Sequence, residues 1–433
     1  MSENKRIRKQ KRLRWEKLDN TAHLFPVIAD SDMTNVYRIS VILKEEIQPE
    51  LLQKALDKVL PKMDGFNMRL RKGIFWYYFE ENVKPAPRVR QENDYPCRYI
   101  VQNQNSSYLF RVTYYKCRIN LEVFHVLADG MGGINFLKEL AYQYLRLSHP
   151  EVLGHGEALS GDTSLNREDS FIRNYRRSQP KGYKTQKAFR IKGEKLQKGQ
   201  FGVIHGKMNT QALKQVAKGY GLSINEYLVT AFVFAVYQAY HRGKPGQKPI
   251  RVAVPVNLRP YFGSVTTKNF FVMVSAEFAP EEGRVYDFAQ VGEIVQNSLK
   301  TQITREHLED LFSYNVSNQM NMMARTVPLF LKNMGIRMVY TSAALANTST
   351  VTNIGNISVE EPYGEYIEDF HAMLAMSKGQ SLKGTISSYG ETLTFTFSSI
   401  LAEPLVQRCF FRLLAGDGLE VTIESNGVYY GEM

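Results

Sequence analysis

A strand that runs into a histidine, followed at once by a glycine-rich turn and a helix, is the feature that most restricts how this chain folds. In the stretch Leu121–Gly133, LEVFHVLADGMGG, apolar residues alternate up to His125, as in a half-buried strand. Beyond Gly130 the apolar positions recur at the spacing of an amphipathic helix. The pattern predicts that strand and helix hold His125 at the edge of a cleft. The same residues also suit an ordinary helix start, with Asp129 as N-cap and Gly130 as a turn residue.

Length and composition indicate a globular protein of two domains. A chain of 433 residues exceeds the size at which one hydrophobic core stops growing. The longest apolar run, Leu228–Tyr237, is too short to span a bilayer, and the N-terminus shows no apolar signal segment. Three scattered cysteines, Cys97, Cys117 and Cys409, form neither a disulfide framework nor a zinc site. We therefore expect a protein of the reducing cytoplasm, without a metal or a permanently bound cofactor.

The net charge of +12 is concentrated in two segments. Seven of the ten residues from Lys5 to Arg14 are Lys or Arg, and a second basic stretch runs from Arg173 to Lys198. Neither has the spacing of a nucleic-acid-binding module. They are read as solvated charge, or as surfaces that attract a phosphate-bearing cofactor, an acidic carrier protein or a membrane surface. We expect no nucleic-acid partner and no transmembrane segment, and the basic arm leaves peripheral membrane contact open.

Periodicity predicts a mixture of strands and helices in each half. The first half contains strands at Val36–Leu43, Phe66–Arg71, Ile74–Phe79, Tyr108–Tyr115 and Arg118–Phe124, and helices at Pro49–Met63 and from Gly130 to about Ser148. In the second half, Asn209 caps a helix, and the capping box Ser223–Glu226 opens a buried helix to about Tyr240. Further strands are expected at Ile250–Val256, Phe270–Phe278, Phe370–Met376, Leu393–Ile400 and Val421–Glu424, and further helices at Val285–Thr304, Pro328–Leu345 and Pro404–Ala415.

These elements suggest four segments. Residues 1–20 form a basic N-terminal arm, residues 21–150 a first lobe, residues 151–202 a crossover linker with one short helix, and residues 203–433 a second lobe. The fold class is α/β with mixed α+β sheets. Two lobes of similar composition place a cleft between them, which is where ligands usually bind.

H-x-x-x-D-G at a strand-to-helix junction, in a chain of two similar lobes, resembles the chloramphenicol-acetyltransferase-like acyltransferases. These include condensation domains of peptide synthetases, plant alcohol acyltransferases, and bacterial and yeast alcohol acetyltransferases. The likeness extends to the helix Ser223–Tyr240, the strand Arg251–Arg259, the segment Asn269–Val274 and the late T-N-x-G stretch Thr352–Gly355. Phe124 stands where condensation domains usually carry a first histidine, and the D-F-G-W-G motif of the plant enzymes is absent. The chain is most similar to free-standing bacterial alcohol acetyltransferases.

The resemblance implies two lobes of the chloramphenicol-acetyltransferase type with an active-site channel between them. The residues support the chemistry, because acyl transfer from a thioester needs a base and neutral imidazole has the pKa nearest working pH. His125 is the expected general base, acting on an alcohol or amine acceptor while acetyl-CoA or another acyl-CoA serves as co-substrate. No nucleophile motif such as G-x-S-x-G is present, so no covalent enzyme intermediate is expected.

Other site residues follow from the same resemblance. Asp129 is expected to shape the loop rather than relay protons, with Arg259 as its candidate partner, although Arg259 also reads as a surface arginine at a strand end. Gly130 allows a tight turn or close approach of substrate. Asn269, Thr352 and Asn353 are candidate oxyanion donors by position, and each also reads as an ordinary turn or strand-end residue.

Two other functions stay open. The first is a condensation-like ester or amide synthase that takes its acyl group from an acyl carrier protein docked on the basic stretch. The second is a non-catalytic binding protein that keeps the fold.

Overall fold

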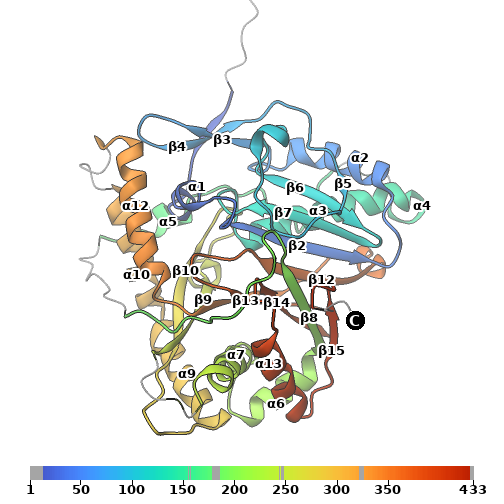
Figure 1. Cartoon of the computed structure of the whole chain (residues 1–433). Helices are drawn as coiled ribbons and strands as arrows, with labels where there is room; N and C mark the ends of the chain where they lie inside the picture. Colours follow the sequence, from blue (N-terminus) through green and yellow to red (C-terminus); the bar gives the residue numbers. More distant parts are fainter. Residues whose placement is uncertain are drawn as a thin grey trace, which may run out of the picture.

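A computed structural model describes residues 13–154, 156, 158–177, 186–242, 244, 248–320 and 326–429 of the chain (Figure 1). The N-terminal half carries a five-stranded sheet in the order β12-β2-β7-β6-β5. Its strands are β2 (Val36–Leu43), β5 (Arg90–Gln91), β6 (Phe110–Tyr115), β7 (Arg118–Phe124) and β12 (Ile367–Leu374). Helix α3 (Gly130–Ser148) packs on β2 and β7 and against α2 (Pro49–Val59). The sheet and these two helices hold the core of this half.

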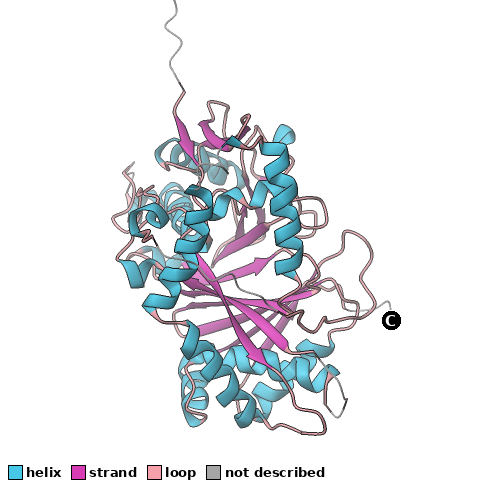
Figure 2. Ribbon diagram, turned by 90° about the vertical axis from the view of Figure 1, so that its left-hand side faces the viewer, coloured by secondary structure: helices cyan, strands magenta, loops and turns pink. Residues whose placement is uncertain are grey.

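A seven-stranded sheet forms the second half, in the order β10-β9-β11-β13-β14-β8-β15. Its strands are β8 (Gly202–Asn209), β9 (Ile250–Asn257), β10 (Phe271–Phe278), β11 (Ser349–Asn356), β13 (Leu382–Tyr389), β14 (Thr392–Ser399) and β15 (Thr422–Ser425). Helices α6 (Thr210–Gly219), α7 (Ile224–Tyr240), α9 (Phe288–Gln302) and α13 (Leu405–Gly416) lie below it in Figures 1 and 2. The mixed α and β architecture expected from the sequence is confirmed.

A small three-stranded sheet, in the order β1-β4-β3, joins β1 (Trp15–Lys17), β3 (Met68–Lys72) and β4 (Tyr77–Glu81). The remaining longer helices are α10 (Arg305–Met320) and α12 (Leu329–Ala344). Short helical elements are η1 (Thr21–His23), α1 (Phe25–Ile28), η2 (Leu60–Lys62), η3 (Gln102–Gln104), α4 (Pro150–Leu153), α5 (Ser170–Asn174), α8 (Arg259–Phe262) and η4 (Tyr363–Tyr366).

Capping residues begin several helices where the sequence places them. The Asn209 side chain accepts hydrogen bonds from the backbone of Gln211 and Ala212 at the start of α6. The capping box of Ser223 and Glu226 opens α7, so two backbone donors of the first turn have partners. Helix α7 is buried along most of its length, because it packs against α9 and α13 beneath the sheet.

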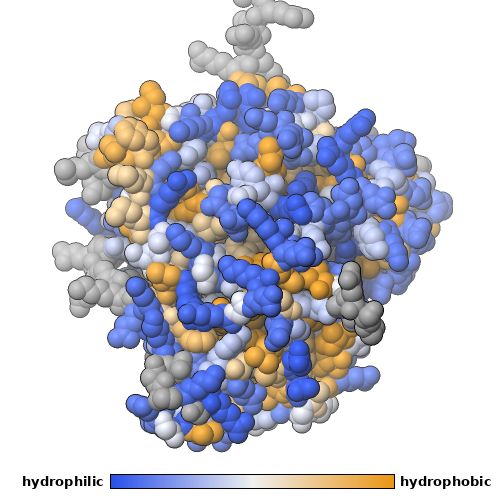
Figure 3. Space-filling view, in the orientation of Figure 1, coloured by the Kyte–Doolittle hydropathy of each residue, from blue (hydrophilic) through white to orange (hydrophobic). Residues whose placement is uncertain are grey.

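Helix α12 differs from α7, because much of its apolar surface faces outward. Phe330, Met334, Met338 and Val339 are exposed, and Figure 3 shows apolar residues gathered over this helix at the upper left of the molecule. In the described part of the chain no single helix has the length and apolarity needed to cross a membrane; one bent pair, α6 and α7, meets that test by length and composition only.

The proposed boundaries need correction at two places. Strand β1, which lies within the predicted arm 1–20, pairs with β4. Strand β12, placed in the second lobe by sequence, pairs with β2 in the sheet of the first half. A three-residue strand is too short to show periodicity, and sequence order alone does not reveal a strand that returns to an earlier sheet. The rest of the division at 21–150, 151–202 and 203–433 stays a prediction.

Candidate active site

His125 is the residue that directly follows strand β7. Its backbone N–H donates to the carbonyl of Asn35, 2.9 Å away, just before strand β2. The imidazole stacks on Phe25, with ring centroids 4.5 Å apart, and meets the Tyr37 ring edge-on at 5.1 Å. Phe271 lies on a further side, with centroids 5.6 Å apart. Backbone and aromatic contacts therefore hold this ring in one orientation.

A chain of side-chain hydrogen bonds sets the tautomer of His125. Its Nδ1 lies 3.1 Å from Oδ1 of Asn269, and Nδ2 of Asn269 donates to Oδ2 of Asp19 at 2.9 Å. A carboxylate can only accept from the amide, so the amide must turn its oxygen toward the imidazole. Nδ1 therefore carries the proton of the neutral ring, and Nε2 keeps its lone pair.

The charge states of these groups follow from their burial. Burial lowers the pKa of His125 below its usual value, although Asp129 and the bond to Asn269 act in the opposite direction. Burial raises the pKa of Asp19 to about 6, against the effect of hydrogen bonds from Asn269 and the backbone of Ala22. Near pH 7 His125 is thus neutral and Asp19 is mostly ionised.

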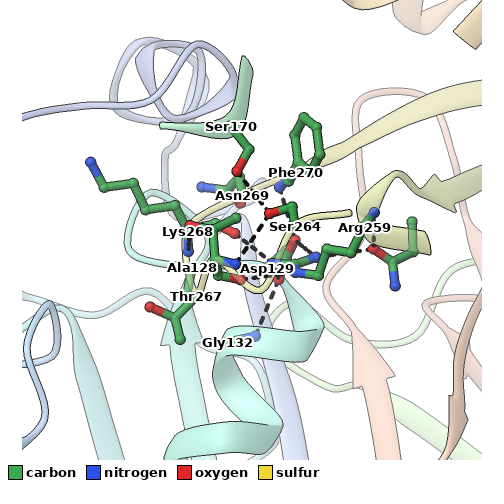
Figure 4. Close-up of polar contacts among 12 residues, drawn as sticks. Ala128, Asp129, Gly132, Ser170, Arg259, Ser264, Thr267, Lys268, Asn269 and Phe270 are labelled. Carbon is green, nitrogen blue, oxygen red and sulfur yellow. Dashed lines mark hydrogen bonds and ion pairs between the residues drawn. The ribbon is translucent and has the colours of Figure 1, made fainter. Parts of the chain in front are cut away.

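Asp129 caps helix α3, and its carboxylate lies in a buried polar cluster (Figure 4). Its Oδ1 accepts from the backbone of Gly132 at 3.2 Å and from Nη2 of Arg259 at 3.0 Å. Its Oδ2 accepts from Nη1 of Arg259 at 2.8 Å and from the backbone of Phe270 at 3.0 Å. These four bonds tie the start of α3 to the chain that leads into β10.

Arg259 is the partner that Asp129 was expected to have, and it lies at the start of α8 with 9% of its surface exposed. Besides the two bonds to Asp129, its Nη1 donates to Oδ1 of Asn257 at 3.1 Å. Nε donates to the carbonyl of Thr266 at 2.8 Å, and Nη2 to that of Lys268 at 2.7 Å. All five N–H donors of the guanidinium are used, so the pair is a complete buried clamp and the surface interpretation of Arg259 is wrong.

The glycines after Asp129 have different surroundings from those expected. A Cβ on Gly132 would lie 2.2 Å from the carbonyl oxygen of Thr267, and one on Gly133 would lie 2.7 Å from the Tyr37 hydroxyl. At Gly130 the nearest atom would be Cγ2 of Ile354 at 3.4 Å, and its φ is not positive. Close packing thus requires Gly132 and Gly133, whereas the tight turn predicted for Gly130 is wrong because that residue has helical backbone. Gly130 lines the cavity. The close approach of the substrate to Gly130 stays a prediction.

His125 opens into a cavity of about 650 Å³, a volume typical of small-molecule sites. Residues from both halves line it, with aromatic and aliphatic side chains in the majority. The N-terminal half contributes Thr21, Leu24, Phe25, Ile28, Asn35, Val36, Tyr37, His125, Asp129, Gly130 and Met131, and strands β9, β10, β11 and β13 supply much of the opposite wall. Nε2 of His125 makes no hydrogen bond within the described residues, so its lone pair is available to a molecule in this cavity.

The three oxyanion candidates are in different situations. The Asn269 amide donates to Asp19 and its oxygen faces His125, so Asn269 orients the imidazole. Asn269 is not among the residues that line the cavity, and its oxyanion role stays a prediction. Thr352 and Asn353 lie on β11 and line the cavity. Asn353 donates to Oδ1 of Asn225 at 3.3 Å and accepts from the backbone of Gly355 at 2.8 Å.

Two cavity or near-cavity residues escaped the sequence analysis. Asp19 lies in the stretch taken as a basic arm, yet it is only 2% exposed and anchors Asn269. Lys383 lies on β13 and lines the cavity. The alternation Leu382, Gly384, Ile386 could have indicated a strand there, but a lysine inside a strand ordinarily reads as solvent-facing. Within the described residues no group of three His, Cys, Asp or Glu side chains is placed to hold a metal ion.

Comparisons with known proteins agree with this geometry at the level of the fold. No family model matches the sequence, and no curated protein matches it. Among solved structures, the first condensation domain of the calcium-dependent antibiotic synthetase has a TM-score of 0.60 at 12% identity, over 94% of this chain and 99% of that one. Polyketide synthase associated protein 5 from Mycobacterium tuberculosis has a TM-score of 0.58 at 14% identity, over 92% and 96% of the two chains.

A third solved structure, F. sporotrichioides TRI101 complexed with coenzyme A and T-2, has a TM-score of 0.61 at 9% identity, covering 95% of this chain and 99% of that one. The chain has the condensation-domain fold. The likeness covers nearly the whole chain in each case, so the condensation-domain fold accounts for both halves and not for one of them alone.

Proposed function

We propose that this protein is a cytoplasmic acyltransferase that moves an acyl group, acetyl in the first instance, from a CoA thioester to a hydroxyl of a small alcohol. The observation that carries the proposal is the state of His125. Its Nδ1 is occupied by Asn269, which is itself oriented by Asp19, while Nε2 has no partner among the described residues and His125 lines a cavity of about 650 Å³. A base held in one tautomer at the wall of a cavity is what such a transfer needs.

The reaction follows from this geometry. Nε2 of His125 accepts the proton of the acceptor hydroxyl as its oxygen attacks the thioester carbonyl. The tetrahedral intermediate collapses, the C–S bond breaks, and the imidazolium gives the proton to the CoA thiolate. The acyl group passes directly to the acceptor, so no enzyme nucleophile is required. An amine acceptor would react in the same way.

The developing oxyanion needs a hydrogen-bond donor in the cavity. The hydroxyl of Thr352 is the better candidate, because the side chain of Asn353 already bonds to Asn225 and to the backbone of Gly355. Thr352 and Asn353 both lie on β11, in the part of the cavity wall that the second half provides. Gly130 would allow the substrate close to the start of α3, since nothing but Ile354 would meet a Cβ there.

A neighbour of the same fold supports CoA as the donor. One neighbour of the same fold is described in complex with coenzyme A. Donor and acceptor entering from opposite ends of the space between the halves would meet at His125.

A carrier-protein thioester is the second candidate donor, because other neighbours are condensation domains of synthetases. The basic stretch from Arg173 to Lys198 was predicted to dock such a carrier, but residues 178–185 lie outside the described residues, as does most of the basic arm proposed for membrane contact. Purified protein offered acetyl-CoA and an acetylated carrier protein in parallel distinguishes the donors by which one is consumed.

The decisive variant is His125→Ala. We expect turnover with the preferred donor and an alcohol panel to fall by about 10² to 10⁴, the usual contribution of one general base, with an unchanged melting temperature. His149→Ala is the matched control, because His149 lies at the other end of α3, near Glu45, and should keep full turnover. A His125→Ala variant with near-normal turnover would contradict the mechanism, and a wild type inactive with both donors would favour a non-catalytic binding protein.

A further inference from the structure

Lys383 is a buried cation in the wall of the cavity that also contains His125. It is 6% exposed, and its Nζ donates to Oγ of Ser377 at 2.6 Å. Within the described residues no Asp or Glu is paired with it, and the one group that favours its charged form is the Cys97 thiol. Burial raises the pKa of that thiol, so Cys97 does not supply a counter-charge.

A buried ammonium without an acid is costly, and folded proteins ordinarily avoid it by pairing. Burial lowers the pKa of Lys383 to about 7, which shows how little the surrounding residues favour its charge. A perturbed cation that faces a cavity is typical of a functional site. The missing anion is therefore expected to come with a ligand.

The surroundings of Lys383 are polar in an otherwise apolar wall. Ser377 and Thr350 line the cavity beside it, and Oγ1 of Thr350 donates to Oε1 of Gln380 at 3.1 Å. Val254, Val256, Leu374 and Ala375 line the same cavity. A small anionic group would thus find an ammonium and a hydroxyl at one place, with apolar contacts for the rest of the molecule.

This patch is close to the reacting position. The backbone of Ala375 donates to the carbonyl of Val36 at 3.1 Å, and the neighbouring carbonyl of Asn35 accepts from the backbone of His125 at 2.9 Å. The charge of Lys383 also disfavours protonation of His125. The two residues therefore act on one chamber. The phosphates of CoA are separated from its thioester by the length of the pantetheine arm, so they are poor candidates for this position.

We propose that Lys383, with Ser377, forms a subsite for a carboxylate carried by one of the two substrates. The inference rests on the proposed acyl transfer and narrows its substrate class. The carboxylate belongs either to a hydroxy acid acceptor or to a dicarboxylic acyl group such as succinyl. In both cases it binds the ammonium through charge-assisted hydrogen bonds, and the apolar wall holds the chain that joins it to the reacting atom.

Matched substrate pairs test the subsite and identify its source. One pair compares ω-hydroxy acids of increasing length with their methyl esters, using acetyl-CoA as donor. The other compares succinyl-CoA with butyryl-CoA, using a neutral alcohol. Wild type, Lys383→Met and the control Lys378→Met, which alters an exposed lysine of the adjoining loop, are assayed with all four.

We expect wild type and Lys378→Met to prefer the carboxylate-bearing member of one pair by at least about 10-fold in kcat/KM, the usual effect of a hydrogen bond to a charged group. Lys383→Met should lose that preference, so that the ratio of kcat/KM between the two members of the pair falls to near 1. The pair that responds identifies the substrate carrying the carboxylate. The absence of a preference in both pairs, or a preference that survives in Lys383→Met, overturns the inference.

Direct binding separates this inference from the proposed function. Calorimetric titration with succinyl-CoA, butyryl-CoA, the ω-hydroxy acids and their methyl esters does not require turnover. A carboxylate-dependent affinity that Lys383→Met abolishes supports the subsite even where wild type transfers no acyl group. Equal affinities of wild type and Lys383→Met for every carboxylate ligand overturn it, even where acyl transfer proceeds.

Discussion

Arg259 and Lys383 are both buried cations of the second half that line the same cavity, yet their surroundings are opposite. Arg259 spends all five donors on protein acceptors, two of them on Asp129. Lys383 has one hydroxyl partner, Ser377, and no acid in the described part of the chain. The first cation has no hydrogen-bonding capacity left for a ligand, and the second has most of its capacity free.

The difference separates two ways of using buried charge. A fully bonded pair fixes geometry, in this case the position of α3 relative to β10 and so the loop that carries His125. The charge of Lys383, which has no acidic partner among the described residues, does not fix geometry in this way. Its proposed role is to bind a ligand that neutralises it. Stability and substrate selection thus depend on different residues of one cavity.

The largest expected effect comes from breaking the Asp129–Arg259 pair. Arg259→Met leaves a buried carboxylate without its partner, so the free energy of unfolding should fall by about 3–5 kcal/mol, as measured by urea denaturation. Arg14→Met is the control, since Arg14 makes a similar two-bonded pair with Asp64 at 3.0 Å, but with about half of each side chain exposed. An exposed pair should contribute less than about 1 kcal/mol.

A double variant sharpens this result. Asp129→Asn combined with Arg259→Met should cost less than the sum of the two single substitutions, because the second change removes a charge that the first had left unpaired. Strict additivity would show that the two residues do not act as a unit, and an inactive Asp129→Asn of full stability would indicate a direct catalytic role for Asp129.

Replacing Lys383, the buried cation without an acid within the described residues, should raise the free energy of unfolding rather than lower it. An ordinary lysine has a pKa of about 10.4, whereas burial lowers that of Lys383 to about 7. Between these two pKa values the unfolded chain therefore binds more protons than the folded one, so stability rises with pH. The loss of folding free energy that the buried ammonium causes is complete below pH 7 and fades as pH rises toward 10. Lys383→Met should stabilise the protein by about 1–4 kcal/mol near pH 6 and by progressively less at pH 9. Destabilisation at pH 6 would make Lys383 a structural cation like Arg259.

The smallest effect concerns the pH profile with a neutral substrate. Because the pKa of His125 is lowered by burial, the acid limb of kcat/KM should have its midpoint below 6.5. Asn269→Ala removes a bond that favours protonation of the ring, so the midpoint should move further down while the rate falls by about 10-fold. A slower rate with an unmoved midpoint would mean that Asn269 only supports the fold.

The sequence predicted elements where periodicity or capping is strong. Strands β2 and β7 and helices α3 and α7 have the expected positions within a residue or two. Strands β8, β11 and β13 and helix α10 were not predicted as elements. Strand β8 is buried on most positions and lacks alternation, strand β13 alternates only over Leu382, Gly384 and Ile386, and α10 shows little separation of polar and apolar faces. Pairings such as β12 with β2 depend on contacts across more than 300 residues of chain, which no local pattern reports.

The candidate site was predictable where a motif carries it and not where tertiary contacts do. His125 follows from local spacing, whereas the role of Asp129 and its pairing with Arg259 follow from the family resemblance. Asp19 and Lys383 could not be found in this way, because their burial arises only when distant segments pack. Asn269 is predicted as an oxyanion donor by position, whereas its amide links Asp19 to His125.

Strand β12 has a consequence for how the protein is made. Until residues 367–374 leave the ribosome, β2 presents an open sheet edge, and such edges invite pairing with other chains. The backbone bond from Ala375 to Val36, next to the segment that holds His125, forms equally late. A nascent or truncated chain ending before this strand would carry the complete H-x-x-x-D-G motif beside an unfinished chamber. Co-translational folding should therefore leave the first half dependent on chaperones for most of synthesis.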